Sequence, residues 1–185
     1  IALLGESASS PWESLDEFFL AFDDRELLFN HLWELVGRET ELNDLTKRLE
    51  DESPVVFLVG AGGSGKSRLL KQALHQYTEH HPTVRMYFLS RDGELSRQSI
   101  DDLGEGRLLL VVDDAHDRPD LHSLFEFASV NRDRVRLVVA TRAYGYDRHR
   151  TQAIRFSLLD PKITAVILED LKLEDAEKLA RQVLE

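Results

Sequence analysis

Residues 60–67 read Gly-Ala-Gly-Gly-Ser-Gly-Lys-Ser, a glycine-rich segment that ends in a lysine and a serine. Glycines let the backbone curl until several N–H groups point at one anion, and a helix that begins here adds the positive end of its dipole. The ammonium of Lys66 would then lie between the β- and γ-phosphates of a nucleotide, and the hydroxyl of Ser67 would bind Mg²⁺. The residues of this segment that we expect to contact the nucleotide are Gly60, Gly62, Gly63, Ser64, Gly65, Lys66, Ser67 and Arg68. The spacing G-x-x-x-x-G-K-S, between a buried strand and a helix, therefore predicts a site for ATP or ADP with Mg²⁺, and a glycine-rich turn that binds nothing is the alternative.

A pair of aspartates follows another apolar run. Residues 108–112 are all leucine or valine and predict a buried strand, and Asp113 and Asp114 come directly after it. A P-loop NTPase needs a carboxylate at the end of a neighbouring strand to hold the Mg²⁺ shell, and we expect Asp113 to do so. Asp114 would polarise the attacking water as a general base, with a helix cap or a water-mediated metal contact as the alternative. Among the histidines, we expect only His116, which comes two residues after Asp114, to be close enough in the sequence to approach the nucleotide.

An arginine follows a further apolar strand, in the sequence Thr141-Arg142. Ligands of a parallel sheet gather beyond the carboxyl ends of its strands. This position would bring the guanidinium of Arg142 to the γ-phosphate, where it can make two parallel hydrogen bonds. An ion pair on the surface is the alternative. The predicted catalytic residues are thus Lys66, Asp114 and Arg142, and the predicted metal ligands are Ser67 and Asp113.

An alternation of strands and helices must position these residues. Short apolar runs predict strands at residues 55–59, 84–89, 108–112, 135–140 and 163–168. Helical spacing of apolar residues predicts helices at residues 36–50, 65–79, 94–103, 119–131 and 174–184. This alternation indicates an α/β fold, in which a five-stranded parallel sheet of the P-loop NTPase type carries helices on both faces.

The first 35 residues precede this pattern. Residues 5–11 are small and polar, as in a linker, and Ser10 before Pro11 predicts a helix N-cap with proline in the first turn. Aromatic residues and leucines recur at helical spacing between residues 18 and 35. We therefore expect an N-terminal helical arm that packs on the domain, with a helix that couples to an upstream effector as the alternative.

The bulk composition narrows the possible functions. The 185 residues include no cysteine, which excludes disulfides and cysteine-based metal or redox sites. The formal net charge of −11 argues against nucleic-acid binding by this part of the protein, because such binding usually needs a basic surface. No apolar stretch has the roughly 20 residues of a membrane span, and no signal peptide is recognisable. We expect a cytoplasmic protein without a membrane partner, and we expect a fragment because the chain begins with Ile1.

Taken together, these segments resemble the STAND class of P-loop NTPases, which are relatives of the AAA+ ATPases and include the NB-ARC domains of plant resistance and apoptosis proteins. The resemblance rests on Val36-Gly37-Arg38-Glu39 with Leu42 and Leu49, on Gly60 to Ser67, on Leu108 to Asp114 and on Leu137 to Arg142. It covers residues 34–170. It implies that Gly37 and Arg38 pack on the adenine and ribose, and that Arg142 senses the γ-phosphate.

Proteins of this class usually act as switches. The resemblance therefore implies an ATP hydrolase with slow turnover, in which the ADP-bound form is closed and exchange for ATP permits self-association and activates a fused effector. It also implies that a helical lid begins near the end of the chain and continues after Glu185, so that this chain alone would bind nucleotide weakly. The expected divisions are a linker and N-terminal helical arm at 1–35, a P-loop NTPase domain at 36–172 and the start of the lid at 173–185.

Three other functions remain open. An AAA+ DNA loader or motor has a similar Arg-Glu loop before its P-loop, and hydrolysis stimulated by DNA would indicate it, although the acidic charge opposes DNA contact. A small-molecule kinase would need an acceptor pocket and an arginine-rich lid, and neither is clear in the sequence. A nucleotide-stabilised scaffold would not hydrolyse ATP, and an unchanged rate in Asp114→Asn would remove the proposed base.

Overall fold

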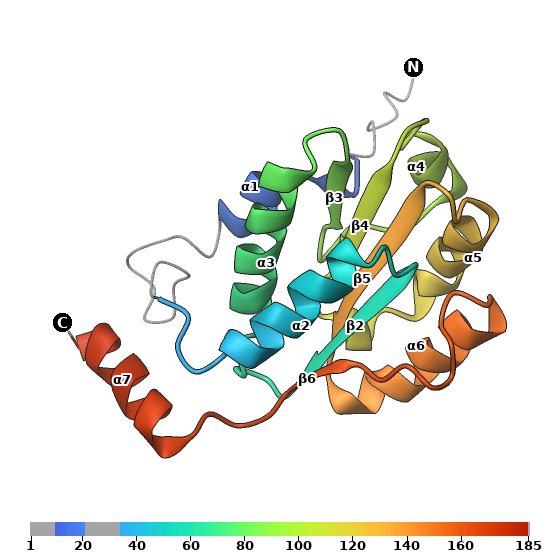
Figure 1. Ribbon diagram of the computed structural model, residues 1–185. Helices are drawn as coiled ribbons and strands as arrows, with labels where there is room; N and C mark the ends of the chain where they lie inside the picture. The colour runs from blue at the N-terminus through green and yellow to red at the C-terminus, as the bar shows by residue number, and fades with distance from the viewer. Residues whose placement is uncertain (1–9, 21–33, 185) are drawn as a thin grey trace, which may run out of the picture.

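Six strands form one sheet at the centre of the molecule (Figure 1). The computed structural model describes residues 10–20 and 34–184. The strands are β1 (Trp12–Glu13), β2 (Val55–Gly60), β3 (Arg85–Leu89), β4 (Leu108–Val112), β5 (Val135–Thr141) and β6 (Val166–Leu168), in the spatial order β1-β3-β4-β5-β2-β6. Strand β1 pairs with β3 antiparallel and every other pair is parallel. The predicted α/β fold with five parallel strands is confirmed, and β1 is an additional edge strand that was not predicted.

Helices cover both faces of this sheet. They are α1 (Leu15–Leu20), α2 (Glu39–Glu50), α3 (Lys66–His80), α4 (Arg97–Asp101), α5 (His122–Val130), α6 (Ala143–Arg155) and α7 (Leu173–Leu184), with short 3-10 turns η1 (Ala115–Asp117) and η2 (Pro119–Leu121) before α5. In β4, Leu108 and Leu110 join the core with α5 and α6, whereas Leu109 and Val111 join the core with α1, α2 and α3. Because helices bury both faces of the sheet, the central strands are continuous apolar runs and do not alternate between apolar and polar residues.

The chain enters the sheet differently from the prediction. Pro11 precedes β1 instead of opening a helix, and the hydroxyl of Ser10 accepts a hydrogen bond from the backbone N–H of Trp12 at 3.3 Å. Helix α1 begins after Ser14, because Ser14 and Glu17 exchange hydrogen bonds between side chain and backbone at 2.8 and 3.3 Å. This reciprocal cap gives the helix a better start than Ser10 does, so the predicted N-cap was wrong.

Helix α1 contains the part of the predicted aromatic arm that the structure describes. Phe18 and Phe19 are buried, and their ring centroids lie 4.4 and 5.3 Å from that of Phe88 in β3. These contacts hold α1 on the same face as α3. The remainder of the predicted arm, residues 21–33, lies outside the described residues.

Helix α6 was missed by the sequence prediction. Its buried residues Gly145, His149 and Ala153 include no large apolar side chain, so residues 143–155 show no strong apolar stripe. Two other elements are shorter than predicted, because α4 spans five residues and β6 spans three. The remaining helices and strands lie within a few residues of their predicted ranges.

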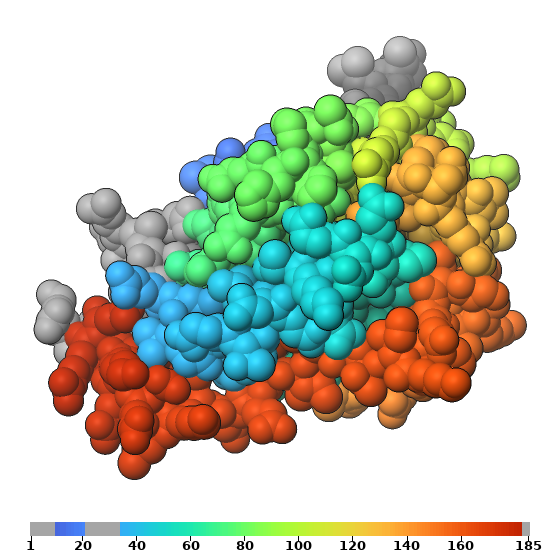
Figure 2. Space-filling model, in the orientation of Figure 1, coloured from blue at the N-terminus to red at the C-terminus, as the bar shows by residue number. Residues whose placement is uncertain are grey.

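Helix α7 lies at the margin of the molecule, where it follows the link from β6 along the lower edge of the view in Figure 2. It approaches the body at Gly37, where an added Cβ atom would lie 2.5 Å from the Asp175 carboxylate. Leu173, in its first turn, is 75% exposed. Within the described part of the chain, no helix combines the length and the apolar composition that crossing a membrane requires.

Candidate functional site

The glycine-rich loop joins the buried strand β2 to α3. Strand β2 is buried over its whole length and ends at Gly60, and α3 begins at Lys66. Gly63 and Gly65 have φ angles of +75° and +91°, which side chains with a Cβ atom rarely adopt. Gly65 is also the N-cap of α3, and no side chain caps the helix there. The first N–H groups of α3 therefore remain available to an anion, with the positive end of the helix dipole behind them.

Lys66 is buried and held by the loop itself. Its side chain is 6% exposed, and Nζ donates hydrogen bonds to the carbonyl oxygens of Gly60 at 3.0 Å and Ala61 at 2.8 Å. Burial lowers the pKa of Lys66, whereas the nearby charges of Asp113 and Asp114 raise it. The ammonium thus points along the loop with neutral partners, which phosphate oxygens can replace with stronger charge-assisted bonds.

Ser67 and Asp113 come together at the ends of α3 and β4. The Ser67 hydroxyl donates to Asp113 Oδ2 at 2.5 Å, and Asp113 Oδ1 accepts from the backbone N–H of Asp114 at 2.9 Å. Asp113 is 5% exposed, and this burial raises its pKa against the effect of the Ser67 hydrogen bond. A buried carboxylate beside a hydroxyl offers hard oxygen ligands to one side of a cation. Mg²⁺ is commonly bound by one or two such groups together with water and phosphate oxygens, so the donor set fits that ion.

Asp114 lies at the turn that follows β4. Its φ angle of +52° is in the left-handed region, which is unfavourable for a residue with a Cβ atom. Its Oδ2 atom lies 3.3 Å from Nη2 of Arg91, which follows β3, and the two side chains are 37% and 53% exposed. The sequence prediction did not identify Arg91. Its place directly after a strand, at the same edge of the sheet as Asp113, would have indicated it.

Arg142 is the N-cap residue of α6, directly after β5. Its guanidinium carbon would lie 3.4 Å from a Cβ atom added to Gly62, so it sits against the phosphate loop. In the part of the chain that the structure describes, this guanidinium makes no hydrogen bond or ion pair with another residue. An exposed and uncommitted guanidinium beside the loop can bind phosphate oxygens.

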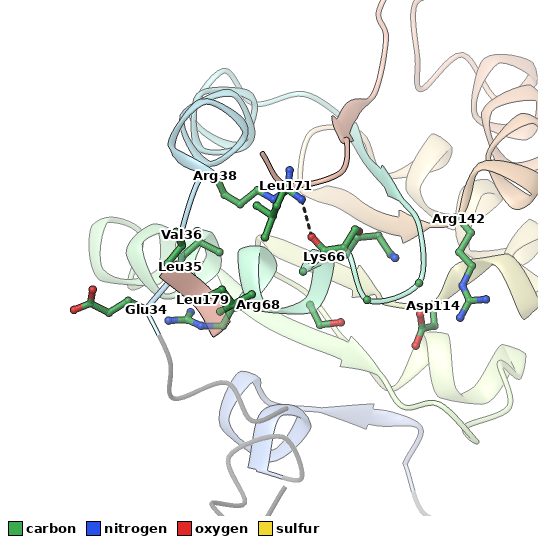
Figure 3. Close-up of a pocket in the computed structure, with 15 residues that line it drawn as sticks. Glu34, Leu35, Val36, Arg38, Lys66, Arg68, Asp114, Arg142, Leu171 and Leu179 are labelled. Atoms are coloured by element: carbon green, nitrogen blue, oxygen red, sulfur yellow. Dashed lines mark hydrogen bonds between the residues drawn. The ribbon is translucent and has the colours of Figure 1, made fainter. Parts of the chain in front are cut away.

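A cavity of about 450 Å³ connects these groups to an apolar region. Its lining residues are Glu34, Leu35, Val36, Arg38, Gly62, Gly63, Ser64, Gly65, Lys66, Ser67, Arg68, Asp114, Arg142, Leu171 and Leu179. Figure 3 shows Asp114 and Arg142 at one end, Leu35, Val36 and Leu179 at the other, and Lys66 between them. Leu171 and Leu179, from the link before α7 and from α7 itself, were not predicted. The cavity thus has a charged end and a second end, called the apolar end below, where leucines and a valine lie beside Glu34 and Arg68.

Arg38 lines the cavity and joins three segments. It is 4% exposed, and its guanidinium donates to Glu41 Oε1 at 2.8 Å, to the Ser64 carbonyl at 3.1 Å and to the Glu169 carbonyl at 2.7 Å (Figure 3 marks the bond to Ser64). These bonds connect the start of α2, the phosphate loop and the link that leads to α7. Most of the guanidinium is thus committed within the protein.

The structure brings most of the predicted site residues to one cavity. Those that line it are Arg38, Gly62, Gly63, Ser64, Gly65, Lys66, Ser67, Arg68, Asp114 and Arg142. Gly37, Gly60 and Asp113 lie next to lining residues without lining the cavity themselves. His116 is buried beneath Tyr144, with ring centroids 5.2 Å apart, and does not line the cavity either.

Comparison with known proteins shows the family to which the chain belongs. The family described as novel STAND NTPase 5 matches residues 32–153, which is more than half of the chain. A comparison with curated protein sequences finds no match. The matched segment contains the phosphate loop, the acidic pair and Arg142.

Solved structures with a similar fold include AAA+ ATPases. The Hsp104–ADP complex of S. cerevisiae has a TM-score of 0.64 at 13% identity, over 94% of this chain and 26% of that chain. Closed Hsp104 with ATPγS and FITC-casein gives 0.63 at 16% identity, over 95% and 33%. C. elegans PCH-2 gives 0.51 at 11% identity, over 88% and 52%. This chain therefore spans between about a quarter and a half of the length of these proteins, and at these identities the likeness concerns the fold.

The family match and the fold lead to the same assignment that the motifs indicated. The chain belongs to the novel STAND NTPases, and its fold is similar to the folds of the Hsp104 and PCH-2 structures.

Proposed function

We propose that this chain is the ATP-binding, Mg²⁺-dependent NTPase module of a STAND-like signalling switch. The observation that supports this most directly is the division of the cavity into two ends. One end has a lysine at a helix N-terminus, a serine and an arginine, and the other has leucines and a valine together with Glu34 and Arg68. ATP and ADP have the same division, with a charged polyphosphate at one end and a flat, largely apolar base at the other.

The phosphate end supplies the binding groups in this proposal. Lys66 would exchange its two carbonyl partners for β- and γ-phosphate oxygens, and the free N–H groups after Gly65 would bind the same phosphates. Ser67 and Asp113 would hold Mg²⁺. When bound, this ion would neutralise part of the negative charge of the phosphates. The apolar end would hold the adenine between Val36 and Leu179.

Hydrolysis would depend on Asp114 and Arg142. Asp114 would polarise the attacking water, and Arg142 would bind the γ-phosphate oxygens as charge moves onto them. In the structure, Asp114 Oδ2 lies 3.3 Å from Arg91 Nη2, so this oxygen would have to leave its arginine partner before it could bind the attacking water. We therefore expect turnover to be slow.

The switch itself would use the ends of the chain. Residues 36–172 would form the NTPase domain, residues 1–35 a linker and arm, and α7 the start of a lid. ADP would favour a closed form, and exchange for ATP would permit self-association and activate a fused effector in the cytoplasm. The net charge of −11 makes nucleic acid an unfavourable partner for this part of the protein.

A nucleotide-stabilised scaffold without hydrolysis is the second candidate. The ion pair between Arg91 and Asp114 favours it, because it occupies the proposed base. The scaffold would bind nucleotide at the same phosphate end and would not hydrolyse it.

Phosphate release from Mg²⁺-ATP by the wild-type chain and by Asp114→Asn separates the two candidates. We expect slow release that falls by about 10²-fold in the variant, because general base catalysis contributes that much, while ATP binding is retained. Asp133→Asn is the matched control. Asp133 is exposed in the loop before β5, at the amino ends of the parallel strands, whereas Asp114 follows the carboxyl end of β4. Equal rates in wild type and Asp114→Asn would exclude Asp114 as the general base. Tight ATP binding without any release of phosphate would favour the scaffold.

A further inference from the structure

The turn that follows the acidic pair is held from behind by α6. His149 Nε2 lies 2.7 Å from the carbonyl oxygen of Ala115, and Arg148 Nη2 donates to the carbonyl of His116 at 2.9 Å. Gly145 permits this approach, because an added Cβ atom would lie 2.7 Å from the backbone of His116. Two consecutive carbonyl groups of η1 are thus bound by two consecutive side chains of α6.

His149 is a buried polar group that the proposed chemistry does not use. The residue is 1% exposed, and its contact with a carbonyl oxygen requires that Nε2 carries the hydrogen. Its Nδ1 atom is buried without a hydrogen-bond partner among the described residues. Burial lowers the pKa of His149, so the ring is neutral at neutral pH. An apolar side chain would fill this space without burying an unpaired nitrogen, so packing alone does not account for the histidine.

The bound turn lies directly after Asp114. Asp114 has a left-handed backbone, and a residue with a Cβ atom keeps such a conformation only where its surroundings impose it. Its own side chain does not cap η1. The bonds from α6 to Ala115 and His116 therefore fix the backbone that directs the Asp113 and Asp114 carboxylates.

The same helix also begins at Arg142. Helix α6 runs without interruption from its N-cap Arg142 through Arg148 and His149. About two turns of one continuous helix therefore connect Arg142 to the side chains that bind the turn at Ala115.

We infer that His149, with the support of Arg148, is a positioning residue that holds the Asp113–Asp114 turn in register with Arg142 through α6. This inference rests on the proposed nucleotide function of the same site. His149 touches neither nucleotide nor metal in it, and it acts by donating the Nε2 hydrogen to the Ala115 carbonyl.

A pair of substitutions separates the hydrogen bond from packing. His149→Gln keeps an N–H donor at a similar distance from the backbone, whereas His149→Leu keeps the volume and removes the donor. Ile154→Ala, which loses apolar packing from α6 five residues after His149 and keeps both hydrogen bonds to η1, is the control for general destabilisation. The readouts are kcat and KM for ATP hydrolysis, ADP titration with Mg²⁺ and with EDTA, thermal unfolding, and hydrogen exchange of a peptide that covers residues 113–118.

We expect His149→Leu to lower kcat by about tenfold, to reduce the difference between ADP affinities with and without Mg²⁺, and to speed exchange in residues 113–118, with KM changed less than about twofold. His149→Gln should keep most of the wild-type kcat, Mg²⁺ dependence and slow exchange. Ile154→Ala should lower the unfolding temperature and leave these three properties unchanged. Wild-type kcat in His149→Leu, or the same loss of kcat in Ile154→Ala at an equal unfolding temperature, would overturn the inference.

Hydrogen exchange distinguishes a failure of this inference from a failure of the proposed function. A folded wild-type chain that neither binds nor hydrolyses nucleotide would contradict the proposed function. In that case, faster exchange of residues 113–118 in His149→Leu but not in His149→Gln would still support the positioning role. Equal exchange in all three proteins would overturn it.

Discussion

The two ends of the cavity differ in what holds them. The phosphate end is built where β2, β4 and β5 leave the core, and Lys66 and Asp113 are 6% and 5% exposed. The apolar end takes Leu171 from the link before α7 and Leu179 from α7, a helix whose Leu173 is 75% exposed. The first end is fixed by the sheet, whereas the second depends on the position of a marginal helix. The phosphate end should therefore set whether nucleotide binds, and the apolar end should adjust how tightly.

Arg38 is the direct connection between the two ends. One nitrogen of its guanidinium, Nη2, binds both the Ser64 carbonyl in the phosphate loop and the Glu169 carbonyl before α7. The segment that it belongs to also meets α7, since Gly37 lies against Asp175. A difference in the phosphate loop can thus reach α7 through a single buried side chain.

The largest effect should come from Lys66→Ala. Hydrogen bonds to charged groups contribute about 1.5–3 kcal/mol each, so we expect about 10²-fold weaker binding of both ADP and ATP. The fold should remain, because the hydrogen bonds of the Lys66 side chain to other described residues go to the carbonyls of Gly60 and Ala61 in its own loop. Calorimetric titration measures the binding, and circular dichroism measures the fold, with exposed Lys162→Ala as the control. Unchanged affinity would show that the phosphate end does not bind nucleotide, and an unfolded variant would show a structural role instead.

Arg142→Ala should have a smaller and selective effect. Since its guanidinium lies beside Gly62 and is not committed elsewhere among the described residues, we expect about tenfold weaker ATP binding and ADP binding within about twofold of wild type. Parallel titrations with the two nucleotides measure the ratio. Equal losses for ADP and ATP would contradict selective binding of the γ-phosphate by Arg142. They would indicate instead that Arg142 binds a phosphate that both nucleotides share.

Leu179→Ala tests the apolar end by itself. Loss of part of an apolar contact is worth about 1 kcal/mol, so ADP and ATP should each bind about fivefold more weakly. Pyrophosphate, which has no base, should bind Leu179→Ala and wild type equally, although Lys66→Ala should weaken it. Leu173→Ala on the exposed face of the same helix is the control. A loss of pyrophosphate binding in Leu179→Ala would mean that the two ends are not separable.

The smallest effect concerns stability beneath the phosphate end. Burial lowers the pKa of His149 from the ordinary value of 6.5, with Arg148 and His116 adding to the effect, while the hydrogen bond to Ala115 opposes it. The unfolded chain therefore takes up a proton before the folded chain does, so this contribution to the free energy of unfolding is complete above pH 6.5 and is lost as the pH falls from there towards the folded pKa.

Urea unfolding at about pH 7.5 and about pH 5.5 should therefore show a larger decrease in stability for wild type than for His149→Gln. An equal decrease in both proteins would mean that other groups cause the pH dependence. In that case the buried imidazole would not report on this part of the site.

The sequence predicted the phosphate end far better than the apolar end. Lys66 and Ser67 belong to a local motif, and Asp113 and Arg142 follow strands whose apolar runs are obvious, so the parallel sheet alone brings them together. Leu179 could not be predicted in the same way, because its place depends on where α7 docks, and that contact is made at Gly37, more than a hundred residues earlier. A single sequence has no pattern that pairs those positions.

Helix α6 and strand β1 could not be predicted from the sequence, also for physical reasons. Helix α6 packs through Gly145 and His149, which leave no apolar periodicity, although it carries both Arg142 and the bonds to the turn after Asp114. Strand β1 has two residues and pairs only at the edge, which is too short for an alternating pattern. Arg91 reaches the site from the second position after β3, and its contact with Asp114 depends on the side-by-side pairing of β3 and β4, which local motifs do not reveal.

Calorimetric titration of the wild-type chain with ADP, first with Mg²⁺ and then with EDTA, tests the central proposal most directly. We expect a dissociation constant on the order of 10 μM with Mg²⁺ and about tenfold weaker binding with EDTA, because Ser67 and Asp113 then hold no cation between them and the phosphates. A chain that is folded by circular dichroism and takes up neither ADP nor ATP at about 1 mM would contradict a nucleotide site at this loop.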